Sequence, residues 1–473
     1  MSTINITETA PIRNVEADAA RSEEIEPFIR YSQRKKAESR PAQARLRRRW
    51  DFEKRHVRRA VWQLEQETDR AQLLRIRELV DRAFVSHRFY RDLYASVGYE
   101  PGAIVTWDDY EALPVINKRA LIDGGFGEDV EAMYPAGMLH SARTSGSSGL
   151  NMTIYQDDAS VEYRHVLYMR HCELMLRDTL QPTDWRYGIY FVAERYTSLL
   201  GDYPFVTVSQ DVPVDILIRN LAEVRPRLVL TLPSALQRLA ETRIDLQEFG
   251  VQAVGTNSER STKEERLHYS DTLGVPVLDE YSSEEMSLIA YECGERRYHL
   301  VEDSGRFDVH GADEEGYGHL VGTSFGNASM PFIRYDQGDV VQIGQAGSQC
   351  PCGSRFRVLT SFRGREDEAL ADGQGTVAAD AVLGLCDATL VDAEANVLQY
   401  QIVQTARDRV VLRAQPIDRA LGLETRPVRK FVATLPSLFE NVRMNVTVEQ
   451  TDDFDRFASG KRRLIIVAMD GAR

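Results

Sequence analysis

The sequence lacks the features that mark membrane, secreted and nucleic-acid-binding proteins. Its 473 residues contain no apolar run of about 18 residues, the length that a membrane-spanning helix needs. No basic segment followed by an apolar one opens the chain, so no secretory signal is indicated and we expect a cytoplasmic protein. Lys and Arg number 58 against 72 Asp and Glu, and the net charge of -14 disfavours a general nucleic-acid binder. We therefore expect a small-molecule partner, no nucleic acid and no membrane, and a monomer or a homodimer.

Cysteine is also scarce, with five in the chain, which excludes a disulfide scaffold of the secreted type. Four metal-binding side chains nevertheless form two short units: Cys293 and His299 in a C-x5-H pattern, and Cys350 and Cys352 in a C-x-C pattern. Three thiolates and one imidazole make a complete tetrahedral set for structural Zn²⁺. The alternative is two unrelated pairs of reduced cysteines, because the units are far apart in the sequence. Cys172 and Cys386 are interpreted as ordinary buried thiols.

The length predicts two or three domains. A polar segment to about residue 27 is followed by a helical pattern from Phe28 to about Val85, and then by short apolar runs that alternate with helical patterns to about Phe362. This alternation predicts a mixed α/β domain with largely parallel strands. After Arg365 the pattern restarts as a smaller α+β unit. The predicted boundaries are 1–85 for a disordered tail and helical extension, 86–365 for the core domain, and 366–473 for a C-terminal domain.

A glycine- and hydroxyl-rich loop follows Arg143. It consists of Thr144, Ser145, Gly146, Ser147, Ser148 and Gly149. Backbone N–H groups of small residues approach an anion closely, and the hydroxyls add donors, so the loop is a candidate polyphosphate cradle. It is not a Walker A motif, because no Lys-Ser or Lys-Thr pair follows the last glycine. The alternative is a plain turn or linker.

Four later segments indicate the function of this loop. They are Asp279–Glu285, Phe332–Asp339, Phe362–Asp367 and Ser459–Arg463. In this order and at these intervals, the segments resemble the motif series of the adenylate-forming superfamily, and the phenylacetate–CoA ligase-like branch in particular. The early segments Phe89–Arg91 and Leu113–Lys118 and the Cys-Pro-Cys-Gly run carry the same resemblance. It covers the chain from about Phe84 to the C-terminus and implies a large α/β adenylation core with a small mobile C-terminal α+β lid domain.

The resemblance implies a role for each matching residue. The Thr144–Gly149 loop would hold the β- and γ-phosphates of ATP, and Glu285 would ligate Mg²⁺. Tyr281 would stack on adenine, and Asp279 would lie near the adenine amino edge. Asp339 would accept the ribose hydroxyls, and Arg365 would add a ribose or phosphate contact, with Arg363 as the alternative residue for the ribose. Lys461, on a mobile loop, would bridge the carboxylate and the α-phosphate, and Asp367 would be the hinge of the lid domain.

Substrate and acceptor are less defined by the motifs. By resemblance, the wall of the acyl pocket comes from residues 187–200 and from Ser234, Thr256, Asn257 and Ser258, and Ser258 is also placed among the cofactor-binding residues. The chain departs from the family in having Ser282 after Tyr281 and a carboxylate, Glu284, before the metal-binding Glu285. Glu284 could alter metal binding or recognise a basic group of the substrate.

Part of this branch also has zinc ligands similar to Cys293, His299, Cys350 and Cys352.

The resemblance implies ATP-dependent adenylation of a carboxylic acid, aryl or related, with release of pyrophosphate and transfer to CoA. A close alternative passes the activated group to an amine or another nucleophile. A second class of hypothesis is a nucleotide-binding regulatory relative without turnover, which the presence of both Lys461 and Glu285 disfavours. ATP, Mg²⁺, CoA and structural Zn²⁺ are the predicted ligands.

Overall fold

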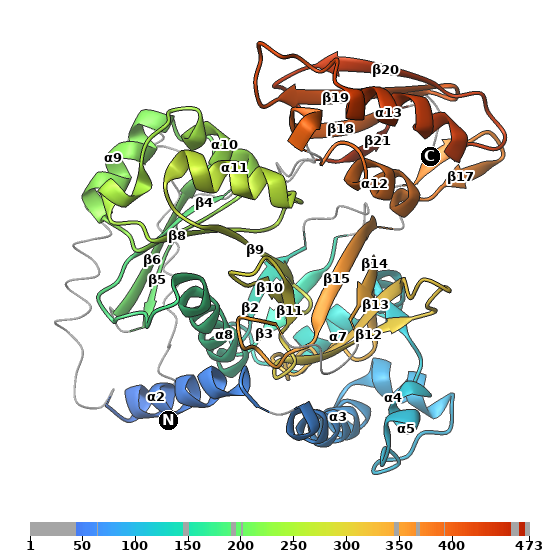
Figure 1. The fold of residues 1–473 in the computed structure, drawn as a ribbon. Helices are drawn as coiled ribbons and strands as arrows, with labels where there is room; N and C mark the ends of the chain where they lie inside the picture. The colour runs from blue at the N-terminus through green and yellow to red at the C-terminus, as the bar shows by residue number, and fades with distance from the viewer. Residues whose placement is uncertain are drawn as a thin grey trace.

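A computed structural model of the chain describes residues 44–63, 65–144, 151–190, 195–199, 202–344, 350–365, 369–391, 393–455 and 463–468. Figure 1 shows a large body that contains helices and one long sheet, with a smaller α+β unit above it. The observed fold class is thus the mixed α/β class that the strand–helix alternation predicts.

Helices cover the N-terminal third of the body. They are α2 (Ala44–Ala60), α3 (Glu65–Ser86), α4 (Arg88–Ala95), α5 (Trp107–Glu111), α6 (Lys118–Asp123) and α7 (Phe126–Ala132). The described part of the predicted helical stretch to Val85 thus contains two helices, one ending at Ala60 and one beginning at Glu65. A capping box at Thr106 starts α5, and the Asn117 side chain caps α6.

Within the described residues, thirteen strands form one sheet in the order β12-β13-β14-β15-β11-β10-β9-β8-β7-β4-β6-β5, with β1 (Ile116–Asn117) beside β14. One half is parallel: β4 (Arg186–Tyr190), β6 (Asp202–Ser209), β7 (Leu228–Thr231), β8 (Ala253–Thr256) and β9 (Val277–Ser283). The edge strand β5 (Arg195–Leu199) runs antiparallel to β6. The helices of this half are α8 (Asp158–Leu176), α9 (Val214–Val224), α10 (Pro233–Ala240) and α11 (Lys263–Leu273), with a 3₁₀ turn at Leu246–Phe249.

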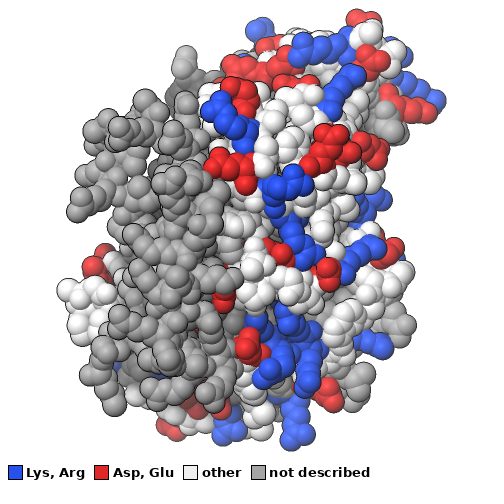
Figure 2. All heavy atoms as spheres, turned by 90° about the vertical axis from the view of Figure 1, so that its left-hand side faces the viewer, with Lys and Arg blue, Asp and Glu red and all other residues white. Residues whose placement is uncertain are grey.

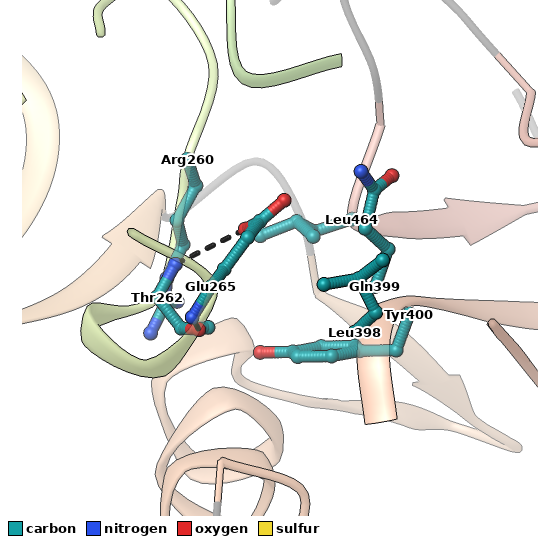
Figure 3. Close-up of a pocket in the computed structure, with 7 residues that line it drawn as sticks. All are labelled: Arg260, Thr262, Glu265, Leu398, Gln399, Tyr400 and Leu464. Atoms are coloured by element: carbon teal, nitrogen blue, oxygen red, sulfur yellow. Dashed lines mark hydrogen bonds between the residues drawn. The ribbon is translucent and has the colours of Figure 1, made fainter. Parts of the chain in front are cut away.

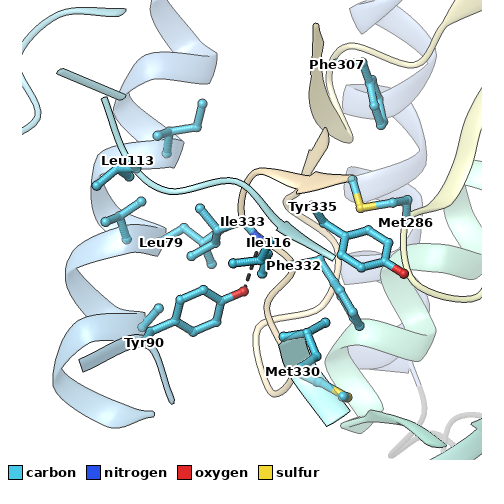
Figure 4. Packing of buried hydrophobic residues seen from close by; sticks show 14 of the residues in the cluster. Leu79, Tyr90, Leu113, Ile116, Met286, Phe307, Met330, Phe332, Ile333 and Tyr335 are labelled. Carbon is cyan, nitrogen blue, oxygen red and sulfur yellow. Dashed lines mark hydrogen bonds between the residues drawn. The ribbon is translucent and has the colours of Figure 1, made fainter. Parts of the chain in front are cut away.

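The other half of the sheet is antiparallel. Its strands are β10 (Ser287–Glu292), β11 (Tyr298–Leu300), β12 (Gly305–His310), β13 (Gly318–Ser324), β14 (Tyr335–Ile343) and β15 (Val358–Arg365). A separate hairpin joins β2 (His140–Arg143) to β3 (Thr153–Gln156). Side chains of α3, including Ile76 and Val80, pack into the core of this half. Figure 4 shows the packing, with Tyr90 reaching the segment before β14, where its hydroxyl accepts from the Ile333 N–H at 3.2 Å.

The elements after β15 form a second sheet in the order β20-β19-β18-β21. They are β16 (Leu370–Asp372), β17 (Gly375–Val377), α12 (Ala379–Asp387), β18 (Val397–Ala406), β19 (Arg409–Pro416), α13 (Arg426–Thr434), β20 (Asn445–Gln450) and β21 (Ile465–Val467), with 3₁₀ turns at Ala393–Ala395 and Leu435–Leu438. The chain changes from α13 to a 3₁₀ turn after Thr434 because Pro436 has no N–H to donate.

Polar contacts join this C-terminal unit to the large body. Arg260 pairs with Asp387 of α12 at 2.8 Å, and the Gln399 side chain donates to the Tyr269 hydroxyl at 3.0 Å. These contacts border a small pocket whose lining residues come from both parts: Arg260, Thr262, Glu265, Leu398, Gln399, Tyr400 and Leu464 (Figure 3). At Gly364 the backbone has φ +108°, and a Cβ there would lie 2.3 Å from Leu383 of α12. Glycine therefore allows the two parts to approach closely at the end of β15.

No described helix is long and apolar enough to cross a bilayer. Figure 2 shows the face that lies on the left of Figure 1. On the described part of that face, basic side chains gather low, at the level of α2, and both signs alternate higher up. Two basic residues of α2 have structural partners: Arg58 pairs with Glu173 of α8, and Lys54 donates to the Tyr203 hydroxyl at 2.7 Å.

Candidate active site

The candidate nucleotide-binding residues meet where β9, β14 and β15 lie together. Asp339 of β14 is directly opposite Arg365 of β15, and the nearest guanidinium nitrogen is 3.8 Å from its carboxylate. The Tyr281 hydroxyl donates to the same carboxylate, and the Tyr281 ring meets Phe362 edge-on with centroids 5.4 Å apart. Burial, reinforced by Asp339, raises the pKa of Tyr281 well above its usual value, so the hydroxyl remains a donor. Three residues from three separate motifs thus form one cluster.

Glu285 lies buried just beyond β9. Its Oε1 atom is 2.9 Å from the Lys118 ammonium and accepts from the Tyr335 hydroxyl at 3.2 Å. Burial and the Glu285 carboxylate raise the pKa of Tyr335, which keeps that hydroxyl protonated. Lys118 is the first residue of α6, and the pairing of β1 with β14 places it here. The carboxylate is therefore held in a fixed position by a cation and a hydroxyl donor.

Asp279 lies on β9, beside the end of β8. Its carboxylate accepts from the Thr256 hydroxyl at 2.6 Å and from the Tyr298 hydroxyl at 2.7 Å, and its N–H donates to Glu292 at 3.0 Å. Burial raises the pKa of Asp279 to about 6, against the lowering effects of Arg266 and the two hydroxyls. The side chain is thus part of a buried polar network.

This raised pKa predicts a specific pH dependence of stability. Between the ordinary pKa of 3.8 and the folded value of about 6, the folded protein holds a proton that the unfolded chain has released. The stabilising contribution is complete below 3.8 and is lost as the pH rises through about 6, by about 3 kcal/mol for a shift of this size. We expect the free energy of unfolding of the wild type, minus that of Asp279→Asn, to fall across this window. Urea unfolding at several pH values measures it, and a pH-independent difference would contradict the assignment.

The remaining predicted residues are placed in part. Thr144 ends the described part of the β2–β3 hairpin, where it is buried and its hydroxyl accepts from the Met152 N–H at 3.0 Å. Ser258, after β8, has a left-handed backbone with φ +67°, a conformation that is uncommon for serine. The loop residues Ser145, Gly146, Ser147, Ser148 and Gly149, together with Asp367 and Lys461, lie outside the described residues.

The two cysteine–histidine units meet in space. The ligand atoms of Cys293, His299, Cys350 and Cys352 all lie within 4.8 Å of one another. His299 pairs through its Nδ1 with the Phe356 carbonyl at 3.0 Å, which leaves Nε2, 3.3 Å from the Cys352 sulfur, as the ligand atom. Antiparallel pairing of β10 with β11, and of β11 with β15, brings the units together.

The end of α2 covers this cysteine cluster. The Arg355 N–H donates to the Val61 carbonyl at 2.9 Å, and a Cβ on Gly353 would lie 2.9 Å from the Trp62 ring. Gly353 also has φ +86°, so glycine is required both for the turn and for the close approach. The helix before the predicted core is thus fixed to the cluster.

Several contacts were not predicted from the sequence. Lys118 belongs to a segment that carries the family resemblance, yet no sequence pattern pairs it with Glu285. Glu284 pairs with Arg164 of α8 at 2.9 Å, and His171 of α8 lies 3.1 Å from Glu280. The alternation of a strand could have shown that residues 280 and 282 face away from Tyr281, whereas Glu284 lies in the turn after β9. The sequence pattern could therefore have indicated the side on which Glu280 lies, but not the partners of Glu284 and Lys118.

Comparisons with known proteins identify the fold. No family model matches the sequence, and no curated protein matches it. Among solved structures, a 2-hydroxyisobutyryl-CoA ligase in the postadenylation state with R3-HIB-AMP has a TM-score of 0.67 at 19% identity, over 87% of this chain and 92% of that chain. The same ligase in the thioesterification state, with 2-HIB-AMP and CoA, has a TM-score of 0.56 at 20% identity over the same shares of the two chains. An acyl acid amido synthetase in complex with 2,4-DB has a TM-score of 0.54 at 12% identity, over 83% and 88% of the two chains. The chain therefore shares its fold with these ligase and synthetase structures, in agreement with the two-domain fold that the resemblance of its motifs implies.

Proposed function

We propose that this protein is an ATP-dependent ligase that adenylates a carboxylic acid, releases pyrophosphate and transfers the acyl group to CoA. The observation that carries the proposal is the meeting of Tyr281, Asp339 and Arg365 beside the buried Glu285. These residues come from separate motifs. They meet in a fold that the chain shares with a CoA ligase whose structures contain R3-HIB-AMP or 2-HIB-AMP.

The side chains fit a nucleotide and its metal. Asp339 accepts one hydrogen bond from Tyr281, and a carboxylate has further lone pairs for the ribose hydroxyls. Arg365 stands beside it to contact ribose or phosphate. Both contacts of Glu285 described above involve Oε1, so we assign Oε2 as its Mg²⁺ ligand. Bound Mg²⁺ would neutralise phosphate charge during attack on the α-phosphate, and Lys118 would hold Glu285 in place for it.

The C-terminal unit supplies the second step of the proposal. Asp367 would be the hinge, and Lys461 would leave the site when the unit turns to admit the thiol. The higher TM-score with the postadenylation ligase, 0.67 against 0.56 for the thioesterification state, favours an adenylation-type arrangement in this structure. We also propose that the core domain spans residues 86–365, between the N-terminal extension and the C-terminal domain.

Product analysis tests the proposed reaction. Purified protein is incubated with ATP, Mg²⁺ and a panel of acids, with and without CoA, and with hydroxylamine or amines as other acceptors. We expect AMP formation with at least one acid and an acyl-CoA by mass spectrometry when CoA is present. Amide products with no thioester would favour the alternative, amine-accepting ligase, a class to which the similar amido synthetase belongs.

We assign the cysteine cluster to structural Zn²⁺. Three sulfur donors and one imidazole nitrogen match the ligands of a closed tetrahedral site. Such a site leaves no position for a substrate, so the metal would stabilise the contact of α2 with the loop at Cys350–Cys352 and take no part in catalysis.

Metal removal is therefore expected to destabilise the protein. We expect about one zinc per chain, as a single four-ligand site allows, and a lower melting temperature after treatment with a chelator. Cys352→Ser is expected to lose the metal, whereas Cys386→Ala, which alters a buried thiol of the C-terminal core, is expected to keep it. Elemental analysis and thermal unfolding measure both effects. A metal-free preparation with unchanged stability would contradict the assignment.

A further inference from the structure

A second polar cluster lies on the opposite side of β9 from the nucleotide residues. Successive side chains of a strand point to opposite faces. Tyr281 accordingly lies with Asp339, while Glu280 and Ser282 face the other way, toward α8, followed by Glu284 just beyond the strand. The two clusters are thus separated by one strand and contributed by adjacent residues.

Helix α8 presents a matching polar face to this side of β9. Arg164, Tyr168 and His171 recur at steps of four and three residues, the spacing of one helical face. Arg164 lies 2.9 Å from Glu284, and His171 lies 3.1 Å from Glu280. The side chains of His171 and Glu280 are 1% and 3% exposed, whereas those of Arg164 and Glu284 are 26% and 37% exposed. The cluster therefore has a buried end and an open end.

The buried end lies at the carboxyl edge of the parallel strands. Asn257 follows the end of β8 and donates to Glu280 Oε1 at 3.0 Å and to the hydroxyl of Tyr190, the last residue of β4, also at 3.0 Å. In the sheet, β4 lies between β6 and β7. The chain forms β6 on one side of β4 first, and later forms β7 on the other side. Ligands of open α/β sheets bind outside the carboxyl ends of the strands at such a reversal of strand order.

One acceptor at this edge has no partner among the residues that the structure describes. Asn257 is 8% exposed, and its Oδ1 atom makes no hydrogen bond to any described residue. A buried amide oxygen without a partner costs free energy unless a ligand or water supplies a donor. Glu280 and Glu284 add carboxylate acceptors on the same side of β9. This side of β9 is therefore rich in hydrogen-bond acceptors.

We infer that this cluster is the subsite for the side group of the acid, and that the acid carries a hydrogen-bond donor, a hydroxyl or an amino group. The inference rests on the proposed adenylation, because it assigns the part of the substrate that is not activated. Asn257 Oδ1 accepts from the donor, and Glu280 sets the position of Asn257. The Arg164–Glu284 pair closes the open end of the subsite. A purely apolar aryl acid would leave the Asn257 oxygen buried without a partner.

Matched pairs of acids test the inference. Each pair shares a carbon skeleton and differs in a hydroxyl or amino group against a methyl group, and pyrophosphate exchange gives kcat/KM for each acid. We expect the donor-bearing acid to be preferred by at least about tenfold, because a site built to bond a donor discriminates against an analogue that lacks it. The hydroxyl and amino arms distinguish the two sources of the donor. Equal kcat/KM within every pair would overturn the subsite and leave the proposed function standing.

Substitution at Asn257 links the preference to the cluster. Asn257→Leu is expected to reduce the preference by about tenfold or more, through a loss of kcat/KM for the donor-bearing acid. Asn220→Leu is the matched control, since Asn220 is also buried and donates to a tyrosine hydroxyl, that of Tyr187, but lies on α9. That control is expected to lower stability without changing the preference. An unchanged preference in Asn257→Leu, or the same loss in the control, would overturn the inference.

Binding measurements separate this inference from the proposed reaction. Isothermal titration of the same acid pairs, in the presence of ATP and Mg²⁺, reports the subsite even if no exchange occurs. Donor-dependent binding that is lost in Asn257→Leu would support the subsite while absent exchange counts against the reaction. Exchange without a preference for the donor-bearing acid would support the reaction and count against the subsite.

Discussion

Replacing Glu285 with glutamine is expected to lower acid-dependent pyrophosphate exchange by roughly two to three orders of magnitude, the loss typical of removing one preorganised electrostatic group. The amide keeps the size of the side chain but removes the charge that suits Mg²⁺. It also leaves the Lys118 ammonium, 2.9 Å away in the wild type, without its anionic partner. The loss should appear mainly in kcat and in the dependence on Mg²⁺ concentration.

Two controls make the Glu285 result specific. Glu78→Gln changes the same functional group at an exposed position of α3 and is expected to have wild-type activity. Lys118→Met in the Glu285→Gln background tests whether the unpaired ammonium causes the loss, because it restores neutrality around the site. Circular dichroism and thermal unfolding establish that each variant folds. Full exchange by folded Glu285→Gln would remove this residue from its assigned role.

Replacing Lys461 with alanine is expected to abolish exchange, by about two to three orders of magnitude or more, while ATP binding is retained. An ammonium on a flexible stem can reach the attacking carboxylate and the α-phosphate together, and alanine cannot replace it. In the proposed mechanism this contact is made only in the adenylation step. Titration with ATP should therefore give a dissociation constant close to that of the wild type.

The two half-reactions sharpen the Lys461 test. When a synthetic acyl-adenylate and CoA are supplied, Lys461→Ala should form the thioester at close to the wild-type rate, because in the proposed mechanism the lysine would have left the site by then. Lys430→Ala, on the exposed side of α13 in the same C-terminal unit, is the matched control for loss of a lysine. Equal damage to both half-reactions would indicate a structural role for Lys461.

Local patterns predicted much of the fold. The short apolar runs that overlap β7, β8 and the start of β9 lie between helical patterns, and this alternation is what a parallel sheet produces. The strand order was not predictable in the same way. Long-range pairing such as that of β11 with β15 depends on contacts between segments that sequence periodicity does not connect.

The candidate site was likewise predictable where local motifs define a residue, and not where long-range pairing brings a residue into place. The motifs pointed to Tyr281, Glu285, Asp339 and Arg365, and the register of β14 and β15 places the last two opposite each other. Lys118 could not be found by spacing, since its position depends on the pairing of β1 with β14. The sequence suggests that Glu284 alters metal binding or recognises a basic group of the substrate. In the structure Glu284 follows β9 and is paired with Arg164 of α8, a long-range contact that sequence spacing does not predict.

Acid-dependent exchange of labelled pyrophosphate into ATP tests the central claim most directly. The exchange requires reversible formation of an acyl-adenylate and does not depend on the acceptor. We predict exchange with at least one acid of a broad panel, dependent on Mg²⁺ and lost in Glu285→Gln and Lys461→Ala. Folded, ATP-binding wild-type protein that gives no exchange with any acid would contradict the account and favour a nucleotide-binding protein without turnover.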